Sequence, residues 1–263
     1  RSVGGFWRRA DTPLSVDFPL ARQPEPARFR FALASDTHLS PASVERTRRL
    51  RTIVDSVAPE LALVTGDLVR DALRVGETEA TGYYDLVRTE FDAFRTPLFT
   101  VPGNHEIFGI ERTLSQVDPA HPLFGRAMYR AFRGPDYYSF NAGGVHFVAL
   151  NTVDIADQWY YGHVDAQQLS WLARDLAMVP AGTPVVTFNH IPFYSVGELL
   201  GGYTDQPPAP TLITVDGRVQ FRHTVSNARE VIAAIAPHPY PLALAGHVHF
   251  RERISLETPG GTI

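Results

Sequence analysis

Short apolar runs, each followed by polar residues, alternate with helix-like segments along most of this chain. The runs have the length of buried strands, and several segments between them carry apolar residues at helical spacing. The runs expected to form strands cover residues 29–34, 61–65, 97–101, 145–150, 185–188 and 242–245. This alternation is typical of α/β structures, in which helices cover the faces of a sheet. The pattern therefore predicts the α/β class.

Helices are expected at residues 42–57, 78–94 and 165–178, where apolar and aromatic residues recur every three or four positions. Two hairpins are also expected. The first turns at 142–144, between residues 137–141 and the strand at 145–150, and the second turns at Asp216 and Gly217. Because a hairpin adds an antiparallel strand to an alternating pattern, we expect a mixed sheet.

Composition excludes several classes of protein. The chain has 263 residues and a formal net charge of −4, so no basic surface for nucleic acid or an anionic membrane is expected. It contains no cysteine, which excludes disulfides, thiolate nucleophiles and sulfur-bound metals. No apolar run approaches the roughly 20 residues that a membrane span requires. The first residue is Arg1 rather than methionine, so the compartment stays open, and a removed secretion signal is compatible with the chain.

The chain divides into an arm and one domain. Residues 1–27 hold four prolines without periodicity and are expected to form an extended arm or linker, whereas residues 28–263 form the domain. Residues 192–224 follow His190 directly and are rich in glycine, proline and tyrosine at their start. This insert is a candidate lid or substrate wall, with a plain surface loop as the alternative.

Oxygen and nitrogen donors follow five of the expected strands. The donors are Asp36, His38, Asp67, Asn104, His190, His247 and His249. In open α/β sheets, loops that leave the carboxyl ends of neighbouring strands aim their side chains into one crevice. We therefore expect the seven donors to meet, and their mixture of imidazole, carboxylate and amide suits transition metals.

The spacing of the donors suggests how they bind. Asp36 and His38 are separated by one residue, so in an extended segment both side chains would lie on one side and share a cation. Asp67 has two carboxylate oxygens and could bridge two cations, and Gly66 before it would permit close backbone approach. Two divalent cations against two carboxylates leave a formal charge near +2, or about +1 with a bridging hydroxide. An anionic phosphate ester suits such a site.

The order Asp-x-His, Gly-Asp, Gly-Asn-His-Glu, His and Gly-His-x-His resembles the calcineurin-like metallophosphoesterase superfamily from about residue 28 to residue 253. The resemblance implies a four-layer α/β/β/α sandwich with two mixed sheets and two divalent or mixed-valence metal ions: manganese, iron, zinc or cobalt. It assigns one metal to Asp36, His38, Asp67 and His249, and the other to Asp67, Asn104, His190 and His247. His105 would contact the phosphate or protonate the leaving oxygen.

These roles imply a phosphoesterase that hydrolyses a phosphomonoester or phosphodiester by in-line attack of a hydroxide that bridges metals roughly 3.5–4 Å apart. The expected partner is a small phosphate ester. Two positions depart from the family pattern: Ser35 replaces the usual glycine, and Arg70 stands where purple acid phosphatases have a tyrosine ligand. Branch features around residues 137–147 and 168–172 resemble the cyclic-nucleotide phosphodiesterase-like and bacterial phosphohydrolase branches.

Several alternatives remain open. The chain could be a scaffold that keeps the fold but has lost turnover, and a dinuclear peptidase is disfavoured because imidazoles outnumber carboxylates among the donors. His105 could merely brace Asn104, and Glu106 is expected to support the site rather than to bind metal. The aromatic cluster at 159–161 could stack a nucleobase or simply pack in the core. His121, His146 and His238 are interpreted as structural, whereas His163 and His223 have no assigned role.

Overall fold

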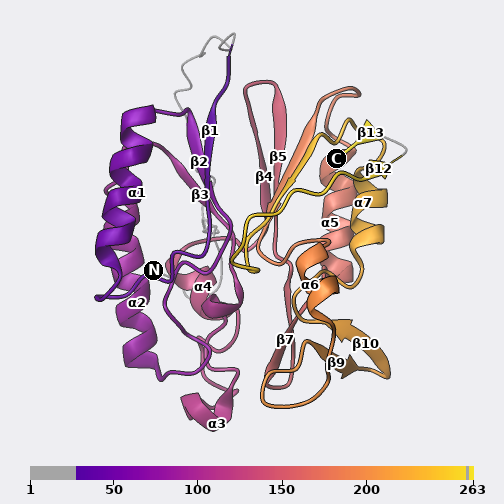
Figure 1. Cartoon of the computed structure of the whole chain (residues 1–263). Helices are drawn as coiled ribbons and strands as arrows, with labels where there is room; N and C mark the ends of the chain where they lie inside the picture. The colour runs from indigo at the N-terminus through magenta and orange to yellow at the C-terminus, as the bar shows by residue number, and fades with distance from the viewer. Residues whose placement is uncertain (1–27, 259–260) are drawn as a thin grey trace, which may run out of the picture.

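Two β-sheets lie face to face at the centre of the protein, and helices cover the outer face of each sheet (Figure 1). The computed structural model describes residues 28–258 and 261–263. Its layers follow the order helix, sheet, sheet, helix, so the predicted four-layer α/β/β/α sandwich is confirmed. The arm expected at residues 1–27 lies outside the described residues.

The first sheet contains β1 (Phe31–Ala34), β2 (Leu61–Val64) and β3 (Leu98–Thr100) in that order. All three strands are parallel, because each connection returns through a helix: α1 (Val44–Val57) and then α2 (Glu77–Phe91). Both helices lie on the outer face of this sheet (Figure 1). We expected two mixed sheets, but the described strands of this one are all parallel.

The second sheet has the strand order β11-β8-β5-β4. Here β5 (Val145–Leu150), β8 (Val185–Asn189) and β11 (Leu242–Leu244) are parallel, and β4 (Tyr138–Ala142) joins β5 as the antiparallel strand of the expected hairpin. This sheet is therefore mixed, as predicted. Its strands are nearly continuous apolar runs because both faces of the sheet are covered.

Alternation along β5 shows how one strand serves two interfaces. Phe147 and Ala149 pack in the cluster between the two sheets, whereas Val148 and Leu150 pack in the cluster beneath the outer helices. The Phe147 ring is fully buried and lies 5.7 Å from the ring of Phe31 across the sandwich, measured between ring centroids. Aromatic rings thus hold the two sheets together.

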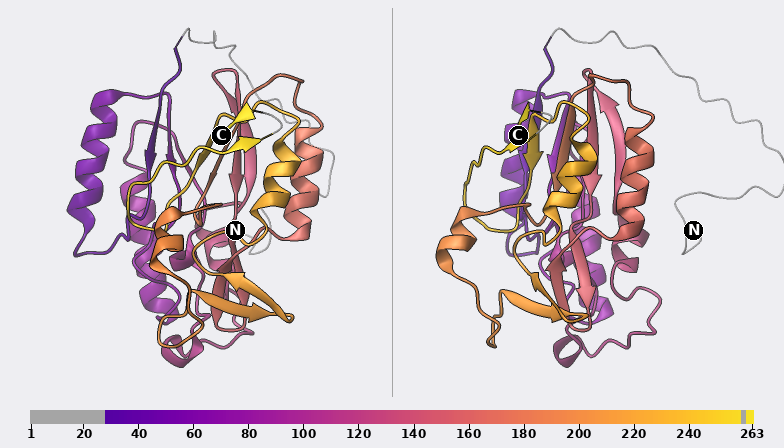
Figure 2. Two further views of the ribbon diagram at one scale, coloured as in Figure 1. Left: turned by 45° about the vertical axis from the view of Figure 1, so that its right-hand side comes forward. Right: turned by 90° about the vertical axis from the view of Figure 1, so that its right-hand side faces the viewer.

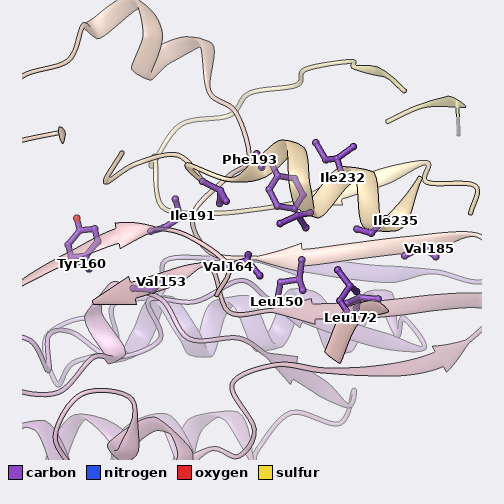
Figure 3. Close-up of a cluster of buried hydrophobic side chains, with 14 of the residues drawn as sticks. Leu150, Val153, Tyr160, Val164, Leu172, Val185, Ile191, Phe193, Ile232 and Ile235 are labelled. Carbon is purple, nitrogen blue, oxygen red and sulfur yellow. The ribbon is translucent and has the colours of Figure 1, made fainter. Parts of the chain in front are cut away.

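The helices α5 (Ala166–Leu176) and α7 (Ala228–Ile235) cover the second sheet (Figures 1 and 2). Their apolar side chains, including Leu172 and Ile235, meet Leu150 and Val185 of the sheet (Figure 3). We expected α5 from its periodicity, but α7 was not among the expected helices. Its burial against a neighbouring helix and the sheet, rather than its length, stabilises it.

The remaining elements are short. They are α3 (Arg112–Ser115), α4 (Ala127–Phe132), β6 (Val153–Ala156), β7 (Trp159–Gly162), α6 (Val196–Gly201), β9 (Leu212–Val215), β10 (Arg218–Phe221), β12 (Glu257–Thr258), β13 (Gly261–Thr262) and a 3₁₀ turn, η1 (Asn104–Glu106). The insert holds α6 and the expected β9–β10 hairpin, beyond the end of the second sheet (Figure 2). Among the residues that the structure describes, no helix has both the length and the apolarity needed to cross a membrane.

The contact between the sheets leads to a first prediction. Replacing Phe147 by alanine removes a buried ring and leaves a cavity, so we expect the free energy of unfolding to fall by about 3–5 kcal/mol. Urea denaturation followed by circular dichroism measures this change. Met178→Ala, at a side chain that is 78% exposed, is the control and should change stability by less than about 0.5 kcal/mol. A loss below about 1 kcal/mol for Phe147→Ala would contradict a close-packed interface between the sheets.

Candidate metal centre

The parallel strands of both sheets end on the same side of the molecule, where the loops after β1, β2, β3, β8 and β11 converge (Figures 1 and 2). Atoms that could bind a metal form two groups there, each within 4.8 Å. One group holds Asp36, His38, Asp67 and His249; the other holds Asp67, His190 and His247. Asp67 belongs to both groups, so the described geometry matches two adjacent cation positions that share one carboxylate.

The second group closes around Asp67. Nε2 of His190 lies 3.3 Å from Oδ1 of Asp67, 3.1 Å from Oδ1 of Asn104 and 3.1 Å from Nδ1 of His247. Nδ1 of His190 donates to the carbonyl oxygen of Thr65 at 2.8 Å. Because a carbonyl oxygen only accepts, the proton of a neutral His190 sits on Nδ1, and its Nε2 presents a lone pair.

The first group joins both sheets. Nε2 of His249 lies 3.2 Å from Oδ1 of Asp36 and 3.2 Å from Nε2 of His38. Nε2 of His38 lies 3.6 Å from Oδ2 of Asp67, the oxygen that the second group does not use. The backbone N–H of His247 also donates to the Asp36 carboxylate at 3.1 Å, which ties the β11 loop to the β1 loop.

Electron-rich atoms therefore face one another in a largely buried space. The lone pair of a neutral His190, the Asn104 oxygen and the Asp67 carboxylate have no donor hydrogen among them, so the set is stable only around a cation or with a proton on Nε2 of His190. The ionisation of His190 responds to the same field. Burial lowers the pKa of His190, but the Asp67 carboxylate outweighs burial and raises it to about 9. Burial lowers the pKa of His247, so its imidazole is neutral and able to bind a metal.

Most of the donor residues have a left-handed backbone. Positive φ angles occur at Asp36 (54°), His38 (40°), Asp67 (50°), His247 (75°) and His249 (57°). Each such residue costs on the order of 1–3 kcal/mol and persists only where the surroundings enforce it. The expectation that Asp36 and His38 share one side of an extended segment was therefore wrong. They converge because the chain turns at each of them.

Two glycines allow the donor loops to approach. Gly66 has a φ of 87°, and a side chain there would collide with the Gly103 backbone and with Nδ1 of His190. A side chain on Gly103 would collide with Asp67. The close backbone approach expected at Gly66 is therefore confirmed. Ser35, which replaces the usual glycine of the first motif, donates to the Thr65 carbonyl oxygen at 3.2 Å and fits the turn.

A buried carboxylate holds the bridging loop in place. Glu106 is fully buried and accepts four backbone N–H groups, those of Asp67, Leu68, Val69 and Gly103, at 2.6–2.9 Å. These bonds fix the loop that carries Asp67 against the loop that carries Asn104. Burial and the nearby Asp67 carboxylate raise the pKa of Glu106, whereas its N–H donors favour the ionised form. Glu106 supports the site and belongs to neither donor group.

His105 lies beside the donors. Its backbone N–H donates to Oδ1 of Asp67 at 2.9 Å, and Nδ1 of its ring donates to the Arg70 carbonyl oxygen at 2.8 Å. The ring packs edge-on against that of His38, with 4.5 Å between centroids. The remaining ring nitrogen, Nε2, lies 3.9 Å from Oδ2 of Asp67. His105 therefore faces the donor groups through a nitrogen that accepts or donates no hydrogen bond within the described residues.

Other histidines and aromatics lie outside the donor groups. His146 contacts Asn141 and Asp175 at 2.8 and 2.9 Å, which agrees with a structural role. Tyr160 and Tyr161 are buried, so both are packing residues rather than a stacking surface. His121 contacts Glu77 at 3.3 Å, and His238 is buried with its Nδ1 unpaired among the described residues.

One polar pair next to the donors was missed. The His223 ring lies 5.1 Å from that of His247, and its Nδ1 lies 2.8 Å from Oε2 of Glu198. Sequence reasoning left His223 without a role and did not single out Glu198. The two residues are 25 positions apart in an insert without a motif, so no sequence signal could have paired them.

The model of the calcineurin-like phosphoesterase family matches residues 29–250. The chain belongs to this family. It is 24% identical over 231 residues to the 3′,5′-cyclic-nucleotide phosphodiesterase alr5338 of Nostoc sp., covering 83% of this chain and 70% of that protein. It is 25% identical over 258 residues to the 3′,5′-cyclic adenosine monophosphate phosphodiesterase CpdA of Escherichia coli K12, covering 89% of this chain and 73% of that protein.

Among solved structures, a dimetal phosphatase from Danio rerio has the same fold, with a TM-score of 0.59 at 17% identity, over 89% of this chain and 85% of that one. As a calcineurin-like phosphoesterase, the protein is a metal-dependent hydrolase of phosphoric esters. The family uses a dinuclear transition-metal centre, and the two donor groups around Asp67 are the candidate ligands for it.

The role of Glu106 leads to a second prediction. Glutamine has one carbonyl oxygen where glutamate has two oxygens, so Glu106→Gln leaves two buried N–H donors facing an amide NH₂ group. We expect a loss of about 2–6 kcal/mol in the free energy of unfolding of the metal-free protein, at about 1–3 kcal/mol for each unpaired donor. We also expect weaker metal binding. Urea denaturation in a chelator and metal titration measure the two effects.

The control for this substitution is Glu79→Gln, at an exposed carboxylate that accepts from the Tyr83 hydroxyl at 2.6 Å. It should shift stability by less than about 0.5 kcal/mol and leave metal binding unchanged. Equal stability of the two variants would show that Glu106 does not organise the loops.

Proposed function

We propose that the protein is a dinuclear-metal-dependent phosphodiesterase, with 3′,5′-cyclic nucleotides as the first candidate substrates. The observation that carries this proposal is the sharing of Asp67 between two groups of donor atoms, each within 4.8 Å. Two cations that share one carboxylate are the usual arrangement for in-line displacement at phosphorus. The likeness to two cyclic-nucleotide phosphodiesterases supports the substrate class.

The donor groups suggest the ligand assignment. In this assignment, Asp36, His38, Asp67 and His249 hold one cation, and Asp67, Asn104, His190 and His247 hold the other, with Asp67 as the bridge. When bound, such cations polarise the phosphoryl group and acidify water. Four of the seven donors are neutral imidazoles and only two are carboxylates, so the loaded site stays positive and attracts an anionic ester. Manganese, iron, zinc and cobalt all suit this donor set.

His105 is the proposed residue for the leaving group. Its Nδ1 donates to the Arg70 carbonyl oxygen, so Nε2 is the nitrogen available to a substrate. When the ring carries a second proton, Nε2–H donates to the ester oxygen that departs as an alcohol. The alternative is that His105 only braces the loop that carries Asn104, through the bond from its ring to the Arg70 carbonyl oxygen.

Turnover tests the proposed function directly. The purified protein, loaded with manganese, zinc, iron or cobalt, should hydrolyse bis(4-nitrophenyl) phosphate and 3′,5′-cyclic AMP faster than 4-nitrophenyl phosphate. Faster hydrolysis of the monoester would replace the diesterase proposal with a phosphatase. No turnover with any metal would instead support a scaffold that keeps the fold.

Asp67→Asn tests the bridging role. Asparagine has nearly the same shape, and its Oδ1 can still accept from the His105 backbone N–H, so the fold should persist. Asparagine lacks the second oxygen and the negative charge of the carboxylate, so metal should be lost from both positions. We expect kcat to fall by at least about 10³-fold, because each cation contributes several kcal/mol of transition-state stabilisation. Metal analysis after dialysis, with exposed Asp118→Asn as the control, measures the occupancy. Two metals bound with normal turnover would refute the bridge.

His105→Ala tests the acid role. Alanine keeps the backbone N–H that contacts Asp67, so metal content should be unchanged. We expect kcat to fall by about 10²–10⁴-fold for an alkyl ester, whose alkoxide needs a proton, and much less for a 4-nitrophenyl ester. A series of diesters with leaving groups of increasing pKa measures this slope. An equal loss for every leaving group would support the bracing role instead.

A further inference from the structure

The insert is anchored to the chain that follows the last donor motif. At the start of α6, the backbone N–H groups of Val196 and Gly197 donate to Oε1 of Glu252 at 2.6 and 3.1 Å. The ring of Phe250 packs against Gly197 so closely that a side chain on this glycine would collide with it. Phe250 and Glu252 lie one and three positions after His249, so α6 is fixed relative to the donor groups.

One polar side chain of the insert lies against a donor ring. His223, near its C-terminal end, packs against the ring of His247 at 5.1 Å between centroids. Its Nδ1 lies 2.8 Å from Oε2 of Glu198 on α6, and the two side chains are 27% and 19% exposed. The neighbouring Arg222 is buried between Trp159 and Tyr160 and donates to the Tyr160 and Pro210 carbonyl oxygens. This backbone position is therefore firmly held.

The hydrogen bond to Glu198 decides which ring nitrogen of His223 carries the proton and which is left for a ligand. An ionised carboxylate only accepts hydrogen bonds, so Nδ1 of His223 carries the proton. In the neutral ring, Nε2 is then an acceptor, and the only side-chain hydrogen bond that His223 makes with the described residues is the one from Nδ1. A lone pair repels phosphoryl oxygens and attracts a hydroxyl or amine hydrogen. The group that fits His223 is therefore a donor on the alcohol portion of the ester.

We propose that His223 is a specificity-determining residue that accepts a hydrogen bond from a hydroxyl of the substrate, and that Glu198 is the positioning residue that orients its ring. The substrate class is thereby narrowed to phosphodiesters whose alcohol carries a free hydroxyl, as a ribose does. This inference rests on the proposed phosphodiesterase function. It assigns to the insert a direct contact with substrate, whereas the competing interpretation is a purely structural link between α6 and β10.

The experiment compares esters that differ by one hydroxyl. kcat/KM is measured for 3′,5′-cyclic AMP and its 2′-deoxy form, and for the 3-hydroxypropyl and propyl esters of 4-nitrophenyl phosphate. The metal-loaded wild-type protein should prefer the hydroxyl-bearing member of at least one pair by about 3–10-fold, the range of one net hydrogen bond. His223→Phe keeps the ring but removes the acceptor, so the preference should fall to about 1 while bis(4-nitrophenyl) phosphate is still hydrolysed.

The chain offers a matched control. His163 contacts Asp154 through the same atom, Nδ1, at 3.0 Å, and the two side chains are 28% and 20% exposed, but the pair lies outside both donor groups. His163→Phe should keep the hydroxyl preference. At position 198, Glu198→Gln retains a carbonyl acceptor and should keep most of the preference. Glu198→Leu should lose it through a higher KM, with kcat little changed.

The outcomes separate the two proposals. Absence of turnover for bis(4-nitrophenyl) phosphate in the wild-type protein would overturn the proposed function itself. With that turnover present, the inference is overturned if the wild-type protein prefers neither hydroxyl-bearing ester or turns over none of them. It is also overturned if His223→Phe keeps the preference, or if His223→Phe slows both members of each pair equally, which would indicate a phosphoryl contact. Circular dichroism melting verifies that each variant is folded.

Discussion

The structure depends on the convergence of lone pairs around Asp67. Its two oxygens face His190 on one side and His38 on the other, and Asn104 contacts the same nitrogen of His190. Only a proton on His190 or a bound cation therefore offsets the charge of Asp67. The surrounding protein supports this arrangement. Left-handed turns present five of the donors, the glycine loops approach closely, and Glu106 binds the bridging loop through four backbone N–H groups. A left-handed backbone and buried lone pairs each cost free energy without a cation, so their occurrence together indicates a cation site.

The two-sheet architecture follows from the same requirement. The first group of donors combines residues after β1 and β2 of one sheet with His249 after β11 of the other, so the spacing between sheets sets the distances between ligands. The phenylalanine cluster between the sheets fixes that spacing, because rings such as Phe147 are fully buried and cannot yield without leaving voids. The backbone bond from His247 to Asp36 adds a direct link at the site. Packing in the core therefore sets the geometry of the metal centre.

The sequence predicted the regular elements and the donor set, but not the geometry that joins them. Apolar periodicity predicted α1, α2 and α5 to within three residues at each end, and it predicted the long strand β5 fully. The family motif named seven candidate donors, and six of them form the two groups that share Asp67. It could not predict the left-handed backbone at Asp36 and His38, because this backbone is imposed by bonds to Gly66 and Asp67 from another loop. The β6–β7 hairpin and the pair of His223 and Glu198 were missed for the same reason: each depends on tertiary contacts.

Reaction class and substrate choice are separable in this molecule. The donors that define the chemistry follow strand ends, and Glu106 accepts backbone N–H groups and belongs to neither donor group. In the proposed reaction the metal ligands act on phosphorus and its oxygens, so they do not distinguish one alcohol from another. Discrimination between esters of different alcohols must come from side chains beside the donors. The insert supplies one in His223, on a backbone that Arg222 holds and with a ring that Glu198 orients. An insert beside the metal ligands lets one fold serve different esters, because an insert can change while the metal ligands stay the same.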